Sequence, residues 1–127
     1  MMTPAARSLQ IFGLYLLGAG GLLMLAPAAL LGLLGLPAPA DAWGRVAGLL
    51  VLFLGIYYLV GARAELLSFM RASVWVRASV IVVLGALVAA GLAPPPLMVF
   101  GIVDLAAAVW TALALRSMGT PLASRTA

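Results

Sequence analysis

The residue with the clearest chemical potential in this sequence is Asp104, because it is an acid inside a long apolar run. It lies about seven residues into the run that follows three prolines, which is roughly 10 Å along a helix at 1.5 Å per residue. A carboxylate near the middle of a membrane span costs about 2.5 to 3.5 kcal/mol on insertion scales, so it should face protein or water. Asp104 is therefore the candidate catalytic or ligand-binding residue.

Arg45 is the expected partner of Asp104. Both are expected toward the outer ends of their spans, and a long arginine side chain extends several ångströms along the membrane normal. A paired Asp104 would accept a bidentate bond and stay charged, whereas an unpaired one would be protonated. Asp41 is an alternative partner for Arg45 at the outer surface. Two roles for the Arg45–Asp104 pair stay open: it fixes how two helices dock, or it serves binding and chemistry.

Thr111 and Tyr15 complete the candidate ligand-binding residues. On a helical wheel Thr111 falls on the same face as Asp104, among small residues that allow close helix packing. Tyr15 lies deep in the first apolar run, and its hydroxyl needs a hydrogen-bond partner that the sequence does not identify.

The chain contains no cysteine and no histidine. Disulfides, thiolate nucleophiles, imidazole bases, histidine-ligated haem and tetrahedral Cys/His zinc sites are therefore excluded. We expect no metal and no cofactor. The missing residue types weigh against catalysis without deciding whether the protein is an enzyme.

Membrane-spanning helices are the elements that must position these residues. Apolar residues occupy 66% of the 127 positions and charged residues 8%, far from the composition of a soluble domain. A helix needs about 20 mainly apolar residues to cross the hydrocarbon. The sequence predicts an all-α fold, an integral membrane four-helix bundle in a single domain over residues 1–116, followed by a disordered polar tail over 117–127. The predicted spans are about 9–26, 43–62, 72–93 and 97–115, with a short interfacial helix at about 28–36.

The first span has an alternative interpretation. Arg7, the apolar run and the small residues after Pro27 also fit a cleaved signal peptide. The run is longer than an ordinary signal h-region, which favours retention of the span.

The basic residues predict the orientation. With four spans, the N-terminus, the 63–71 connection and the C-terminal tail share one side. That side holds all the basic residues except Arg45: Arg7, Arg63, Arg71, Arg77, Arg116 and Arg125. The positive-inside rule therefore predicts cytoplasmic N- and C-termini in the inner membrane.

The individual arginines and glycines carry further expectations. Arg77 is expected to extend to the inner headgroups, and Glu65 to partner Arg77 or Arg71. Arginines near the interface are ordinary topology signals that would also attract anionic lipid. Gly44 and Gly48 flank Arg45 at GxxxG spacing, which favours close helix approach or a homodimer face.

Three segments carry a family resemblance: Leu25-Ala26-Pro27, then Leu30-Leu31-Gly32-Leu33-Leu34-Gly35-Leu36, then Arg45-Val46-Ala47-Gly48-Leu49. In this layout the chain resembles the small four-helix bacterial membrane proteins of the DoxX-like kind and related uncharacterised families. The resemblance covers the first two spans and the hairpin order of the rest. It implies a four-helix bundle and transfers no activity and no site residue.

Three functions are compatible with the sequence. The first is an accessory or self-associating membrane component that contacts a partner membrane protein or a second copy. The second is a binder of a lipophilic small molecule, or an isomerase- or cyclase-like enzyme, that uses Asp104 as acid with Arg45 beside it. A proton-coupled transporter ranks third, because the spans hold no second carboxylate for a relay. No nucleic-acid partner is expected, since the arginines sit mostly at span ends.

Overall fold

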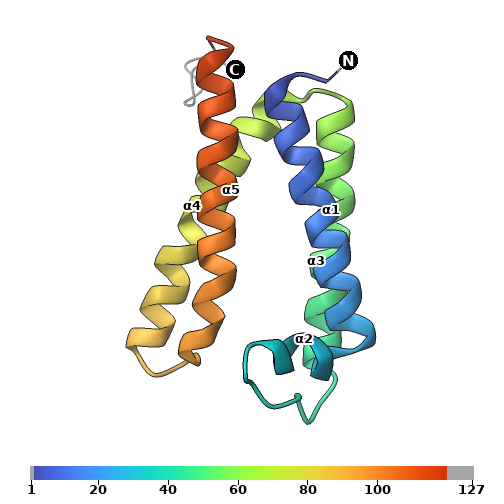
Figure 1. Ribbon diagram of the computed structural model, residues 1–127, viewed down its shortest axis with the longest axis vertical. Helices are drawn as coiled ribbons and strands as arrows, with labels where there is room; N and C mark the ends of the chain where they lie inside the picture. The colour runs from blue at the N-terminus through green and yellow to red at the C-terminus, as the bar shows by residue number, and fades with distance from the viewer. Residues whose placement is uncertain (1, 120–127) are drawn as a thin grey trace. The chain divides into compact units, whose positions relative to one another are not determined.

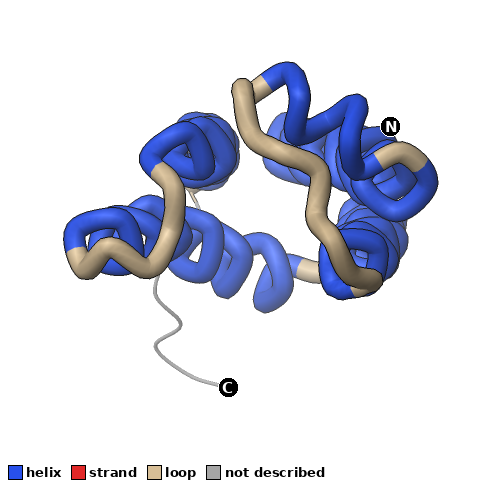
Figure 2. The backbone as a smooth tube through the Cα atoms, turned by 90° about the horizontal axis from the view of Figure 1, so that it is seen from below, coloured by secondary structure: helices blue, strands red, loops and turns tan. Residues whose placement is uncertain are grey.

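The computed structural model describes residues 2–119, which form helices and loops without a strand (Figure 2). Most of the polar tail predicted over 117–127, including Arg125, lies outside the described residues. The helices in chain order are α1 (Pro4–Leu25), α2 (Pro27–Leu33), α3 (Trp43–Arg63), α4 (Leu67–Ala89), the 3-10 turn η1 (Pro95–Leu97) and α5 (Met98–Ser117) (Figure 1).

Within residues 2–119, four helical segments are long and apolar enough to cross a membrane: α1, α3, α4, and η1 continued by α5. In an α-helix the backbone N–H and C=O groups bond to each other, as lipid requires. The predictions of an all-α fold and of four apolar helices of membrane-spanning length are therefore confirmed.

The helix ends differ from the predicted spans because local backbone preferences, and not charge, set them. α1 begins at Pro4 rather than near residue 9: proline is favoured in the first helical turn, and the Thr3 hydroxyl accepts the N–H of Ala6 at 3.2 Å. α4 begins at Leu67 rather than near residue 72. The charged Arg71 lies inside the helix, because arginine is a good helix former. It ends at Ala89, before Gly91, whose φ of +75° is left-handed.

The short helix α2, Pro27–Leu33, corresponds to the interfacial helix that the sequence predicts at about 28–36. Pro27 occupies its first turn. After the helix, Gly35 adopts a φ of +72°, and its N–H donates to the carbonyl of Gly32 at 3.1 Å while Leu36 N donates to Leu31 O at 2.9 Å. This pair of bonds is a Schellman motif, which ends helices at a left-handed residue.

The chain divides into two compact units, which we describe separately. Residues Gln10–Val60 form the first, called here the glycine unit; Met1–Leu9 and Gly61–Ala127 form the second, called the polar unit. α1 and α3 each contribute to both units.

In the glycine unit, α1 and α3 meet backbone to backbone at glycines. A Cβ added to Gly20 would lie 2.8 Å from the carbonyl oxygen of Gly48, and a Cβ added to Gly48 would lie 2.8 Å from the oxygen of Gly20. Gly13 and Gly55 form a second such pair, at 3.1 and 2.9 Å. On both helices the two glycines are one heptad apart, so they recur on one face.

The GxxxG prediction is therefore wrong for one of its two residues. Gly48 does allow close helix approach, but a Cβ on Gly44 would meet Pro39 of the preceding loop at 2.7 Å. Gly48 acts with Gly55, at a spacing of seven residues instead of four.

In the polar unit, α4 and α5 form an antiparallel pair. Gly101 marks the register, because a Cβ there would lie 3.0 Å from the Cα of Ile81. Nearer the other end of the pair, Val74 on α4 and Ala108 on α5 are buried. The polar side chains described next lie at this end.

Candidate functional site

A cluster of four buried polar side chains occupies the polar unit. Ser8 comes from α1, Ser73 and Arg77 from α4, and Thr111 from α5, and each is at most 4% exposed. Arg77 Nη2 donates to Thr111 Oγ1 at 2.8 Å and to Ser73 Oγ at 3.1 Å. The hydroxyl oxygens of Ser8 and Thr111 are 2.7 Å apart. The cluster thus joins three helices through hydrogen bonds.

The hydrogen bonds of this cluster run in one direction. Ser8 Oγ donates to the carbonyl of Ala5 at 2.7 Å, and a hydroxyl has a single hydrogen to give. Ser8 therefore accepts from Thr111, and Thr111 in turn accepts from Arg77. Ser73 is arranged similarly: it donates to the carbonyl of Met70 at 2.8 Å and accepts from Arg77. A buried network with its hydroxyls satisfied specifies a single arrangement of the helices.

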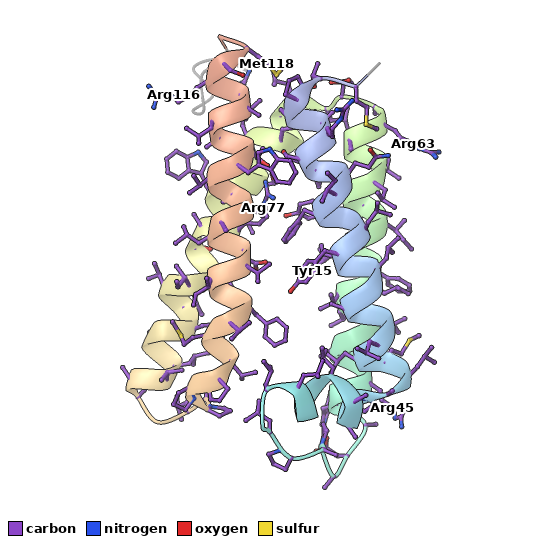
Figure 3. The ribbon with its side chains drawn as sticks, in the orientation of Figure 1. Tyr15, Arg45, Arg63, Arg77, Arg116 and Met118 are labelled. Atoms are coloured by element: carbon purple, nitrogen blue, oxygen red, sulfur yellow. The ribbon has the colours of Figure 1, made fainter. Side chains whose placement is uncertain are left out.

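The prediction that Arg77 extends to the inner headgroups is wrong. Its side chain is 2% exposed and lies against α5 (Figure 3). Helical side chains lean toward the N-terminus of their helix, which brings the guanidinium back over Ser73, one turn earlier. Arg77 Nε accordingly donates to the backbone oxygen of Ser73 at 3.2 Å.

Sequence reasoning missed Ser8, Ser73 and Arg77 as members of a site. The spacing of Ser73 and Arg77 by four residues was a signal, since such residues are neighbours on a helix. Ser8 had no comparable signal, because its partner Thr111 is distant in the sequence. Of the predicted site residues, Thr111 is the one at the centre of the cluster.

Asp104 lies on the same face of α5 as Thr111, about two turns earlier at 3.6 residues per turn. Gly101 and Ala108 on this face are buried, whereas Asp104 is half-buried. Arg77 acts on it electrostatically. Within the described residues the Asp104 carboxylate takes part in no hydrogen bond and no ion pair. The structure thus brings Asp104 and Thr111 onto one face and leaves the carboxylate as an open acceptor.

Arg45 caps the end of α1 within the glycine unit. Its Nη1 donates to the carbonyl oxygens of Met24 at 2.8 Å and Leu25 at 3.1 Å. The last carbonyls of a helix have no donor in the helix itself, and Pro27 brings no N–H of its own to this end. Asp104 belongs to the other unit, so the Arg45–Asp104 pair stays a prediction.

The alternative pairing of Arg45 with Asp41 is wrong. Asp41 Oδ1 accepts the N–H of Trp43 at 3.1 Å, at the start of α3, and the described residues contain no ion pair between Asp41 and Arg45. A short acid at this position satisfies a free backbone donor of the first helical turn.

Tyr15 is held in the glycine unit by ring packing. Its ring centroid lies 5.6 Å from that of Phe12, and Phe12 lies 5.2 Å from Tyr58 of α3, both pairs being tilted. Tilted pairs at such distances are the preferred aromatic geometry. Tyr15 and Arg45 therefore belong to one unit, and Thr111 and Asp104 to the other.

Glu65, between α3 and α4, is bonded to the start of α1. Its Oε1 accepts the hydroxyl of Thr3 at 2.6 Å, and its Oε2 accepts the N–H of Thr3 at 3.1 Å. These bonds hold the pKa of Glu65 below its ordinary value. The prediction that Glu65 pairs with Arg71 or Arg77 is wrong, because Thr3 occupies the carboxylate. We call this contact the Thr3–Glu65 clasp.

The backbone of Glu65 is unusual as well. It is the one described non-glycine residue with a positive φ, +51°, and it ends α3 as Gly35 ends α2 and Gly91 ends α4. Glu65 N donates to Ala62 O at 3.1 Å. A side chain in this conformation costs about 1 kcal/mol or more. The same residue makes the two hydrogen bonds of the clasp to Thr3.

The described residues contain no group of three or more His, Cys, Asp or Glu side chains that could hold a metal ion. The chemistry available in the polar unit is an acceptor carboxylate at Asp104, on the face of α5 that also carries Thr111 of the hydroxyl and guanidinium cluster.

No family model, curated protein or solved structure matches this chain. The resemblance to DoxX-like proteins therefore rests on the sequence segments alone and stays a prediction.

Proposed function

We propose that this chain is a multi-pass protein of the inner membrane, a four-helix bundle with cytoplasmic N- and C-termini that works by contact with a partner in the membrane. It is an accessory or self-associating component without an evident catalytic motif. The four apolar helices of spanning length support the membrane location. The excess of arginine on one side supports the orientation.

The hydrogen bonds of the polar side chains in the helices support a role in contact with a partner chain. Arg45 caps a helix end, and Thr111 joins three helices. Both are engaged in holding their own unit together, so neither is set up to act on a substrate. Asp104 is different, because it makes no hydrogen bond within the described part of the chain.

The open carboxylate of Asp104 is the observation that carries the proposal. Polar groups buried in lipid require hydrogen-bond partners, and acids inside spans pair with other groups almost without exception. A partner chain supplies the donor that the described residues do not. Gly101 and Ala108, both small and buried, lie on either side of Asp104 on this face, and the other polar residue there, Thr111, already has hydrogen-bond partners.

The test is purification of the full chain from its membrane in a mild detergent, followed by mass measurement of the intact particle. Wild type is expected as a complex, with a second copy or another chain. Asp104→Leu is expected to release the monomer, because leucine offers no acceptor. Asp41→Asn is the matched control: it changes an exposed acid that can keep its bond to Trp43. A lone wild-type monomer, or an Asp104→Leu variant that stays in the complex, contradicts the proposal.

A second candidate is a binder of a lipophilic molecule, or an isomerase- or cyclase-like enzyme with Asp104 as its acid. The same face of α5 favours it, since Asp104 lies among residues that are buried. Arg45 has less to contribute than the sequence predicted, because its Nη1 is bonded to carbonyls. Mass spectrometry of molecules extracted from the purified protein separates the candidates. If Asp104→Asn loses a bound molecule while the number of protein chains in the particle stays the same, the binding function is favoured.

A further inference from the structure

The polar unit carries a second feature, independent of Asp104. Arg7 lies near the start of α1, Arg63 at the end of α3, Arg71 near the start of α4 and Arg116 near the end of α5. Arg63 and Arg116 lie at the end of this unit where α1 begins and α5 ends (Figure 3). We call these four residues the arginine end.

The clasp gathers three of these arginines. It joins Thr3 to Glu65, and so places the first turn of α1 beside the link between α3 and α4. Arg7 follows Thr3 by one turn, while Arg63 and Arg71 stand on either side of Glu65. At 1.5 Å per helical residue, each is within about two turns of the clasp.

The charges of the arginine end are not balanced by the described residues. The acid nearest to these arginines in the sequence is Glu65, and its two carboxylate oxygens accept hydrogen bonds from Thr3. No ion pair joins Glu65 to any of the four arginines in the described residues. Four arginines and one glutamate leave a net charge of +3 on the described side chains here. Like charges near one end of a unit attract an anion from outside.

The environment of the Arg71 side chain indicates which kind of anion would bind. Its Nε is shielded from solvent and has no hydrogen-bond partner in the described residues, while the side chain as a whole is only half-buried. A buried donor without a partner raises the free energy of the folded protein. An anion on the open side of the guanidinium would offset that cost by charge, and the planar fork of arginine suits phosphate oxygens.

We propose that the arginine end binds the phosphate headgroups of anionic phospholipids, with Arg71 as the main contact and Arg7 and Arg63 beside it. The source is lipid and not free phosphate, because these arginines border apolar helices of spanning length and thus lie at the level of the headgroups. This surface does not depend on the partner contact at Asp104.

The experiment uses the full chain in a mild detergent, with native mass spectrometry to count bound lipids. Phosphatidylglycerol and phosphatidylcholine with the same acyl chains are added in turn. Wild type is expected to retain phosphatidylglycerol at least about tenfold better. Arg71→Gln is expected to reduce this retention about fivefold, the typical contribution of one basic side chain near an anionic surface. The triple variant Arg7→Gln/Arg63→Gln/Arg71→Gln is expected to lose it about a hundredfold, if the effects add.

Arg45→Gln is the matched control, since it removes an arginine of the other unit, and it is expected to bind like wild type. Glutamine preserves helix propensity, and helix content by circular dichroism verifies that each variant is folded. Equal retention of the two lipids by wild type overturns the proposal. So does an Arg45→Gln variant that loses as much binding as Arg71→Gln. Displacement of the lipid by millimolar inorganic phosphate assigns the surface to free phosphate and overturns the lipid source.

Discussion

The two units of this protein hold their helices together by different main contacts. In the glycine unit, α1 and α3 approach until backbone atoms touch at Gly13, Gly20, Gly48 and Gly55. In the polar unit, the guanidinium of Arg77 and the hydroxyls of Thr111 and Ser8 form hydrogen bonds between the helices. Lipid tails are as apolar as leucine, so burial of apolar side chains does not drive helices together in a membrane. Close packing and hydrogen bonding are the two means that remain. Glycine contacts predominate in the glycine unit, where Arg45 adds hydrogen bonds from α3 to α1, and the buried cluster predominates in the polar unit, where Gly101 also packs closely against Ile81.

The difference has a consequence for tolerance to change. A backbone contact leaves no space for even one methyl group, whereas a hydrogen-bonded cluster tolerates a substitution that keeps its donors and acceptors. Steric change should therefore damage the glycine unit most, and loss of a hydroxyl should damage the polar unit most.

The largest effect is expected from Gly20→Ala. The new Cβ would contact the backbone of α3 at Gly48, and overpacking of this kind costs about 1 to 3 kcal/mol of unfolding free energy. The control is Gly18→Ala on the same helix, where a Cβ meets nothing within 4 Å. That variant is expected to gain about 0.5 to 1 kcal/mol from helix propensity. Unfolding in detergent, titrated with a denaturing detergent, measures both. Equal unfolding free energies for the two variants would contradict the view that close backbone packing holds the glycine unit together.

Thr111→Val is expected to be the next most damaging change. Valine has the shape of threonine but neither accepts from Arg77 nor donates to Ser8, and unsatisfied buried polar groups cost about 1 to 3 kcal/mol. Thr111→Ser keeps the hydroxyl and should retain most of the stability. The same unfolding titration distinguishes them. If valine and serine are equally tolerated, hydrogen bonding does not hold the polar unit together.

Arg45→Met is expected to cost about 1 kcal/mol, the usual contribution of a helix cap. Methionine keeps an unbranched apolar chain but donates nothing to Met24 and Leu25, so the loss should be local. Hydrogen exchange should accelerate at the junction of α1 and α2 and stay unchanged in α4 and α5. Arg45→Lys should recover part of the protection. Faster exchange in α4 and α5 as well would indicate that Arg45 supports the polar unit, as the predicted pair with Asp104 requires.

The smallest effect is expected at the clasp, and it depends on pH. The pKa of folded Glu65 is lowered by its bonds to Thr3, so the clasp adds stability at pH values above the unfolded pKa, about 4.3. That contribution is lost as the pH falls from this value through the lower folded pKa. Glu65→Gln should be less stable than wild type at pH 7, and the difference should shrink below pH 4. A difference that stays constant with pH would exclude the carboxylate as its source.

Much of the fold was predictable because lipid permits few alternatives. Runs of apolar residues with Pro27 and Pro94 as breaks indicated four spans, and the backbone had to be helical inside them. The predicted span ends were less accurate, because charge marked them while capping by Thr3 and the left-handed Gly91 set the true helix ends.

The candidate site was predictable only in part. Asp104 and Thr111 could be assigned to one face from helical periodicity, and the structure keeps them there. The partners could not be assigned. Arg45 was matched to Asp104 by depth and charge, yet it bonds to carbonyls at the end of α1, which carry no sign in a sequence. Arg77 was placed at the lipid headgroups by its charge, although Thr111 and Ser73 bond it in the interior.

The sequence by itself determined that this chain is helical, that it has four apolar helices of spanning length, and which residues share a helix face. These properties follow from composition and from the 3.6-residue period, which are local. Only the tertiary structure decided that Gly20 meets Gly48, that Ser8 bonds Thr111 and that Glu65 holds Thr3. Each of these contacts joins residues that are distant along the chain. Their distances depend on how the helices pack, and helix packing in lipid is governed by small differences in shape and hydrogen bonding that no local pattern records.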